Sequence, residues 1–179
     1  MREAGKITAG ALELIEKNIQ PGVTTACLNN IAEEYILSHN AVPAFKGYQG
    51  FPASICASVN AQVVHGIPND ERLKEGDIVS IDIGAVFRGY YGDAARTFPV
   101  GNISEEAALL IKTTEESFFE GLKYARVGYR LSDMSHAIQA YVESRGYSVV
   151  KSFVGHGIGR NMHEDPQVPN FGNPGMGPR

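Results

Sequence analysis

A hairpin pattern between residues 80 and 97 constrains this chain more than any other feature. Two strand-like segments, I-V-S-I-D-I-G-A-V and Y-Y-G-D-A-A-R-T-F, flank the short turn F-R-G-Y. The glycine supplies the permissive backbone that such a turn needs. If the turn centres between Arg88 and Gly89, Asp82 faces residue 95, and Asp93 lies two residues along on the same face. Diagonal neighbours of this kind lie about 7–8 Å apart at Cα and closer at the side chains.

Two carboxylates held on one face repel each other unless a cation lies between them. Asp82 and Asp93 can therefore hold one or two divalent metal ions. A lone aspartate near a turn is more commonly solvated or caps the turn. That alternative suits Asp82 poorly, because Ile81 and Ile83 flank it and an unpaired carboxylate in a core strand is costly.

The composition is that of a single globular domain. The 179 residues are 43% hydrophobic and 20% charged, and a chain of this length buries roughly 70% of its unfolded surface. A net charge of −4 gives no support for a nucleic-acid or membrane surface, and no apolar segment approaches the roughly 20 residues of a membrane span. Two cysteines make a disulfide framework improbable, so a cytoplasmic location is expected.

Hydrophobic periodicity predicts an α/β fold built from two similar halves. Helical stripes are expected at residues 2–18, from Thr24 or Thr25 to about 40, from 104 onward with Leu110 and Phe118 facing inward, and at 132–146. Strands are expected at 54–60, in the hairpin and at 147–150, and residues 63–68 are expected to be the end of a strand that runs into a turn. Residues 1–100 then form one helix-helix-hairpin half, and 101–179 form a second, unfinished half.

Three histidines join the two aspartates as candidates for chemistry. His156 is surrounded by glycines in V-G-H-G-I-G, which let the backbone approach a metal or substrate closely, and His163 follows seven residues later. His65 comes after two valines. Each could alternatively be an ordinary hydrogen-bonded loop histidine. The glycine pattern does not predict nucleotide binding, since residues 161–166 do not open a helix.

Four longer strings identify a family. In order, they are F-K-G-Y-Q-G-F-P-A-S-I-C-A-S-V-N-A-Q-V-V-H-G-I-P, G-D-I-V-S-I-D-I-G-A, Y-G-D-A-A-R-T-F and V-G-H-G-I-G-R-N-M-H-E-D-P-Q-V-P-N. Together they closely resemble a type I bacterial methionine aminopeptidase, along essentially the whole chain. The resemblance implies a single catalytic domain over residues 1–179 with the pita-bread fold, in which two pseudo-symmetric α/β halves enclose a metal centre.

The resemblance also implies roles for the candidate residues. Asp82 resembles the bidentate ligand of one metal, Asp93 the carboxylate bridging both, and His156 the histidine ligand of the other. His65 and His163 match two catalytic histidines that contact the substrate and stabilise the tetrahedral intermediate. The expected cofactors are two divalent ions such as Co, Mn, Fe or Zn.

A pocket for the methionine side chain is implied as well. Its lining matches Tyr48, Phe51, Cys56 and Met162, with Phe45 nearby. Sulfur and aromatic groups suit a thioether, with contacts of about 0.3–1.5 kcal/mol each. Met162 replaces the aromatic residue expected at its position.

The implied function is removal of the N-terminal methionine from nascent polypeptides by metal-assisted hydrolysis, preferring a small second residue. The expected protein is a monomer that works near the ribosome and binds neither nucleic acid nor membrane. Two alternatives remain: a related pita-bread X-Pro peptidase, and a non-catalytic binding module. The family uses two further glutamate ligands that these residues do not contain, so we expect a chain truncated at both ends and inactive by itself.

Overall fold

The predicted hairpin is present in the computed structural model, which describes all 179 residues. Strands β3 (Ile78–Phe87) and β4 (Tyr90–Pro99) are antiparallel and pair right up to the turn. The loop therefore contains only Arg88 and Gly89, with left-handed φ angles of 51° and 77°. Two such residues make a type I′ turn, which matches the right-handed twist of the strands. The predicted centre of the turn is confirmed.

Two further strands complete the sheet on the other side of β3. Strand β2 (Ile55–Val59) pairs antiparallel with residues 79–83 in the first half of β3, and the short β1 (Val42–Pro43) pairs with the end that leads into the turn. A 3-10 turn, η1 (Tyr48–Gly50), lies in the connection between β1 and β2. This connection is the aromatic, glycine-rich segment of the sequence, and it crosses the sheet face described below.

The expected strand end at residues 63–68 is wrong. This segment contains no strand and reaches the outer edge of β2 only through Gly66, whose carbonyl accepts from the Ala57 amide at 2.8 Å and whose amide donates to the Ser58 hydroxyl at 3.1 Å. The approach is close enough that a Cβ atom on Gly66 would lie 2.2 Å from the Ala57 carbonyl oxygen. A glycine contact of this kind replaces regular pairing, so Val63 and Val64 form no strand.

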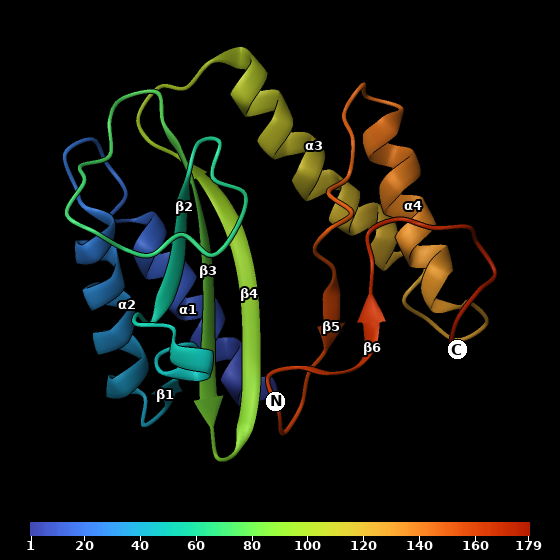
Figure 1. The fold of residues 1–179 in the computed structure, drawn as a ribbon, viewed down its shortest axis with the longest axis horizontal. Helices are drawn as coiled ribbons and strands as arrows, with labels where there is room; N and C mark the ends of the chain where they lie inside the picture. The colour runs from blue at the N-terminus through green and yellow to red at the C-terminus, as the bar shows by residue number, and fades with distance from the viewer. The chain divides into compact units, whose positions relative to one another are not determined.

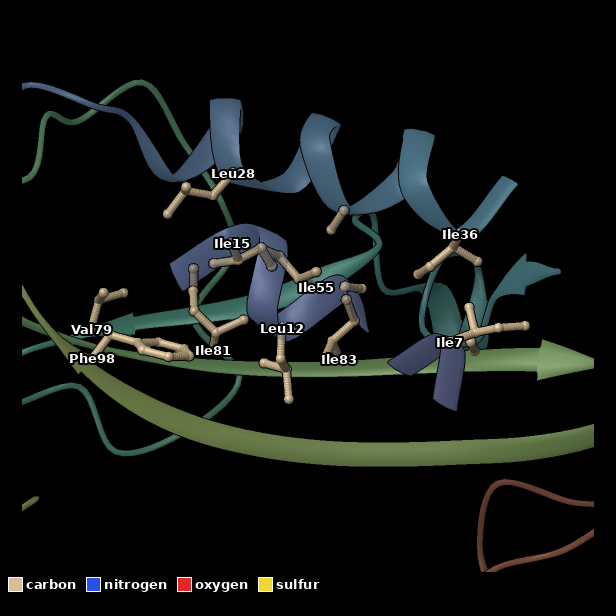
Figure 2. Packing of buried hydrophobic residues seen from close by; sticks show 14 of the residues in the cluster. Ile7, Leu12, Ile15, Leu28, Ile36, Ile55, Val79, Ile81, Ile83 and Phe98 are labelled. Atoms are coloured by element: carbon tan, nitrogen blue, oxygen red, sulfur yellow. The ribbon is translucent and has the colours of Figure 1, made fainter. Parts of the chain in front are cut away.

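Two helices cover one face of the sheet (Figure 1). Helix α1 (Arg2–Glu16) packs on β3 and β4, and α2 (Thr25–Ser38) packs on α1. The predicted cap is confirmed, because the Thr24 hydroxyl accepts from the Cys27 amide at 3.1 Å. Figure 2 shows the side chains of helices and strands pointing into the layer between them. The buried residues of this hydrophobic core include Ile7, Leu12, Ile15, Leu28, Ile36, Ile55, Val79, Ile81, Ile83 and Phe98.

The elements above belong to one of two compact units. The first comprises residues 1–107 with 158–162, and the second comprises 108–157 with 163–179. The later elements are α3 (Glu105–Leu122), α4 (Leu131–Glu143) and the antiparallel strands β5 (Gly155–Gly157) and β6 (Glu164–Val168). The strand expected at 147–150 is not formed. The strands form instead around the two histidines, where the sequence shows glycine and proline rather than an apolar alternation.

Helix α3 buries a different face from the one expected. Leu110 and Phe118 were expected to face inward, but their exposed fractions are 38% and 57%. The buried positions are Thr113, Ser117 and Gly121. A Cβ atom on Gly121 would lie 2.6 Å from Ile138, so small residues let α4 approach closely.

No helix in the structure combines the length and the apolar character that crossing a membrane requires.

Candidate active site

The two hairpin carboxylates share the sheet face that the helices leave uncovered. Asp82 lies opposite Ala95, and Asp93 lies opposite Gly84, which places the two aspartates diagonally on one face. Their carboxyl groups are within hydrogen-bonding distance of each other. Asp82 is half-buried and Asp93 is exposed. The predicted register is confirmed.

The surroundings of Asp82 oppose its ionisation. Burial, followed by the charge of Asp93 and the hydrogen bond between the two groups, raises the Asp82 pKa to about 7, although the Ile83 backbone amide acts in the opposite direction. At neutral pH such a pair either shares a proton or takes up a cation. Two oxygen ligands that gain from a nearby positive charge fit a divalent metal ion. Neither unit by itself contains a group of three or more His, Cys, Asp or Glu side chains that could hold one.

An apolar cluster lies on the same face, beside the carboxylates. Cys56 of β2 lies directly opposite Asp82 of β3, so their side chains point to the same side of the sheet. The buried members of the cluster are Ala44, Phe45, Cys56 and Met162, and the partly buried ones are Tyr48, Phe51, Val86 and Tyr91. All four residues expected to line a pocket, together with Phe45, are therefore brought together.

The Cys56 thiol is kept protonated. Burial and the negative charges of Asp82 and Asp93 raise its pKa to about 12. A neutral, 5% exposed thiol behaves as a small apolar group rather than as a nucleophile. Cys56 therefore lines the cluster and does not attack a substrate.

Two close approaches bring distant segments onto this face. Gly84 has no side chain to hold back the β1–β2 connection, and a Cβ atom there would lie 2.8 Å from the Ala44 Cβ. The Ala44 amide donates to the Gly84 carbonyl at 2.9 Å. Met162 arrives by another route, since the Tyr91 amide donates to the Gly159 carbonyl at 2.9 Å. The glycine-rich segment around residue 159 therefore delivers Met162 to the cluster.

Sequence reasoning missed Val86 and Tyr91 as members of this cluster. Both could have been found from strand alternation, because residue 86 shares the face of Asp82 and residue 91 shares that of Asp93.

His65 lies on an exposed loop of the first unit. Its φ angle is 59°, in the left-handed region that is uncommon for residues other than glycine, although asparagine, aspartate and histidine are enriched there. The next residue, Gly66, is buried and held through its amide by the Ser58 hydroxyl at 3.1 Å. A strained backbone next to a well-anchored glycine is a common feature of functional loops. The catalytic role of His65 stays a prediction.

The other two histidines lie together in the second unit. His156 is the central residue of β5, and His163 immediately precedes β6. Their ring centroids are 4.1 Å apart, with the planes tilted by 42°. His156 Nδ1 lies 2.9 Å from the Gly157 carbonyl oxygen, which it can bond as a donor in the matching tautomer. The Nε2 atom is then the one suited to a metal, but this role and that of His163 stay predictions.

Comparisons with known proteins agree with one another. Residues 1–178 match metallopeptidase family M24. A methionine aminopeptidase of Clostridium acetobutylicum is 62% identical over 180 residues, covering 100% of this chain and 72% of its relative. The crystal structure of methionine aminopeptidase from Thermotoga maritima has a TM-score of 0.97 at 48% identity, covering 99% of this chain and 72% of that one.

The structure of an Xaa-Pro dipeptidase from Bacillus anthracis is also similar, with a TM-score of 0.79, but at 26% identity and covering 94% of this chain and 46% of that one. The identities separate the two kinds of peptidase, although both share the fold. The chain belongs to metallopeptidase family M24, with its pita-bread fold, and within that family to the methionine aminopeptidases.

Proposed function

We propose that this protein is a metalloaminopeptidase that removes the N-terminal methionine from newly made polypeptides. One observation carries the proposal. A pair of carboxylates that favours a cation lies on the same sheet face as an apolar cluster of sulfur and aromatic side chains. The first arrangement suits metal-assisted hydrolysis, and the second suits a thioether side chain.

The metal centre would use Asp82, Asp93 and His156 as ligands. Bound divalent ions, of which we propose two of the Co, Mn, Fe or Zn kind, would polarise the scissile carbonyl and make a bound water acidic. Asp82 and Asp93 would supply negative charge that is poorly solvated in the protein alone, so metal binding relieves their repulsion. His65 and His163 would contact the substrate and stabilise the charge that develops on its carbonyl oxygen.

The pocket would select the first side chain of the substrate. Tyr48, Phe51, Cys56 and Met162, which cluster on this face, would line it, and the neutral thiol of Cys56 would add no charge. A flexible, polarisable lining accepts an unbranched side chain such as that of methionine, whereas a charged side chain would be buried without a partner. A small second residue is part of the proposal, as are a monomeric state, a cytoplasmic location and action near the ribosome.

The test uses protein expressed from its full reading frame and supplied with Mn²⁺. We expect methionine to be released from Met-Ala-Ser, less from Met-Leu-Ser, and no amino acid to be released from Ala-Pro-Ser. A metal chelator should stop the release, and added Mn²⁺ should restore it. Faster cleavage of Ala-Pro-Ser than of Met-Ala-Ser would instead establish an X-Pro peptidase. Tight metal binding without cleavage of any peptide would establish a binding module.

A further inference from the structure

Glu33 joins two parts of the connection between β1 and β2. Its carboxylate accepts from the Lys46 ammonium at 2.6 Å and from the Ser54 hydroxyl at 2.7 Å. Lys46 lies just after the connection leaves β1, and Ser54 lies just before β2 begins. One side chain on α2 therefore holds both limbs of the loop that carries the aromatic pocket residues.

Asn29 lies one turn earlier on the same helix and holds the second limb again. Its side-chain oxygen accepts from the Ser54 amide at 2.8 Å and from the Ile55 amide at 3.3 Å. Residues four apart lie on one helix face, so Asn29 and Glu33 act side by side. Ser54 is fully buried, and its hydroxyl is satisfied by Glu33.

Backbone hydrogen bonds within the loop shape its tip. Gly47, Gln49 and Gly50 have left-handed φ angles of 84°, 47° and 81°. The Gly47 amide donates to the Phe51 carbonyl, and the Tyr48 amide donates to the Phe45 carbonyl. These bonds are local. The hydrogen bonds that join the two limbs of the loop to α2 are made by the side chains of Glu33 and Asn29.

The geometry assigns Glu33 and Asn29 as positioning residues that set the width of the side-chain pocket. Phe45 precedes Lys46, and Phe51 lies three residues before Ser54, so drawing the limbs toward α2 fixes where both rings stand. The assignment rests on the proposed function, because it gives the pocket its selectivity. The bonds from Lys46 and Ser54 also hold the pKa of Glu33 below its usual range, because both favour the ionised carboxylate that accepts them.

Helix packing does not require these two polar residues. The apolar face of α2 is buried through Leu28, Ala32 and Ile36, each fully shielded from solvent. Truncating Glu33 should therefore loosen the loop while the sheet and its helices stay intact.

The first arm of the test measures amide hydrogen exchange in Glu33→Ala, with Glu34→Ala as the matched control. Glu34 is the adjacent, exposed residue of α2. Losing the charge-assisted bonds should speed exchange in residues 44–54 about tenfold or more, with α1 and β3 unchanged. The control should match the wild-type protein. Unchanged exchange at 44–54, or an equal increase throughout the first unit, would overturn the assignment.

The second arm measures kinetics with Met-Ala-Ser, norleucyl-Ala-Ser and Leu-Ala-Ser. Glu33→Ala should raise KM for methionine about tenfold, change kcat less, and narrow the preference for methionine over leucine. Glu33→Gln keeps a hydrogen-bond acceptor and should restore part of the wild-type KM and part of the preference for methionine. An equal fall in kcat on all three substrates, with KM unchanged, would overturn the assignment. If the wild-type protein cleaves none of them, the proposed function fails, and the exchange arm still decides the role of Glu33.

Discussion

The two faces of strand β3 differ in their roles, although residues of the two faces alternate along one short segment. Val79, Ile81 and Ile83 point toward α1 and α2 and are completely shielded from solvent. Asp82 and Gly84 belong to the other face of the strand. There, Asp82 pairs with the carboxyl group of Asp93, and the missing side chain of Gly84 lets the β1–β2 connection come close. The helix face stabilises the fold, whereas the opposite face carries groups that destabilise it.

Adjacent residues of β3 therefore serve different purposes, one contributing to stability and the next to the proposed function. Asp82 has an elevated pKa because burial and Asp93 oppose its charge, so the pair lowers the stability of the metal-free protein at neutral pH. Strain and unfavourable charge of this kind persist at functional sites because the surrounding structure holds them in place. Substitutions on neighbouring positions of β3 should therefore have contrasting effects.

The largest effect is expected from Asp93→Asn. Removing one carboxylate leaves bound metal poorly neutralised, so metal affinity should fall and methionine release from Met-Ala-Ser should drop about 1,000-fold or more. In transition-state terms this is about 4 kcal/mol. The same variant should unfold at the same denaturant concentration as the metal-free wild-type protein, or at a higher one, because a repulsive charge is lost.

Ser80→Ala provides the matched control on the same face of β3. Its hydroxyl bonds the Thr97 hydroxyl at 2.7 Å and faces away from the core. It should keep wild-type activity within a few-fold. Full activity in Asp93→Asn, measured at saturating metal, would contradict the role given to the hairpin carboxylates.

Ile83→Ala tests the opposite face of the strand. Ile83 is fully buried among residues of α1, α2 and the sheet, so truncation removes apolar contacts and leaves a cavity. We expect a loss of about 2–5 kcal/mol in the free energy of unfolding, measured by urea denaturation. The folded fraction should keep its metal affinity. A cost below about 1 kcal/mol, or a specific loss of metal binding without destabilisation, would undo the contrast between the faces.

Local rules were sufficient for the hairpin and for the first two helices. A period-2 pattern and a two-residue turn define the register, so the relation between Asp82 and Asp93 follows from the sequence alone. Likewise, Thr24 marks the start of α2 by the ordinary chemistry of a helix cap. Both features depend on residues close together in the chain.

Features that depend on distant partners were not predictable from local pattern. The inward face of α3 was assigned to Leu110 and Phe118, but Gly121 packs against Ile138, and the large side chains stay exposed. Similarly, the strand end assigned to 63–68 is replaced by the contacts of one residue, Gly66, with β2. Close backbone approaches by glycine leave no hydrophobic period to recognise.

The smallest effect is a pH dependence confined to the carboxylate face. In the metal-free protein the Asp82 pKa is about 7, above the value of about 3.9 for an unfolded chain. The folded state therefore binds this proton more tightly, and its stabilising effect, complete below about pH 4, is lost as pH rises through 7. With a chelator present, the free energy of unfolding should be about 2 kcal/mol lower at pH 8 than at pH 5, a figure reduced from the full shift because Asp82 is half-buried. Asp82→Asn should lose this slope, whereas Ile83→Ala should keep it at lower overall stability. Urea titrations of the three proteins at both pH values make the measurement, and a slope that persists in Asp82→Asn would place its origin elsewhere in the molecule.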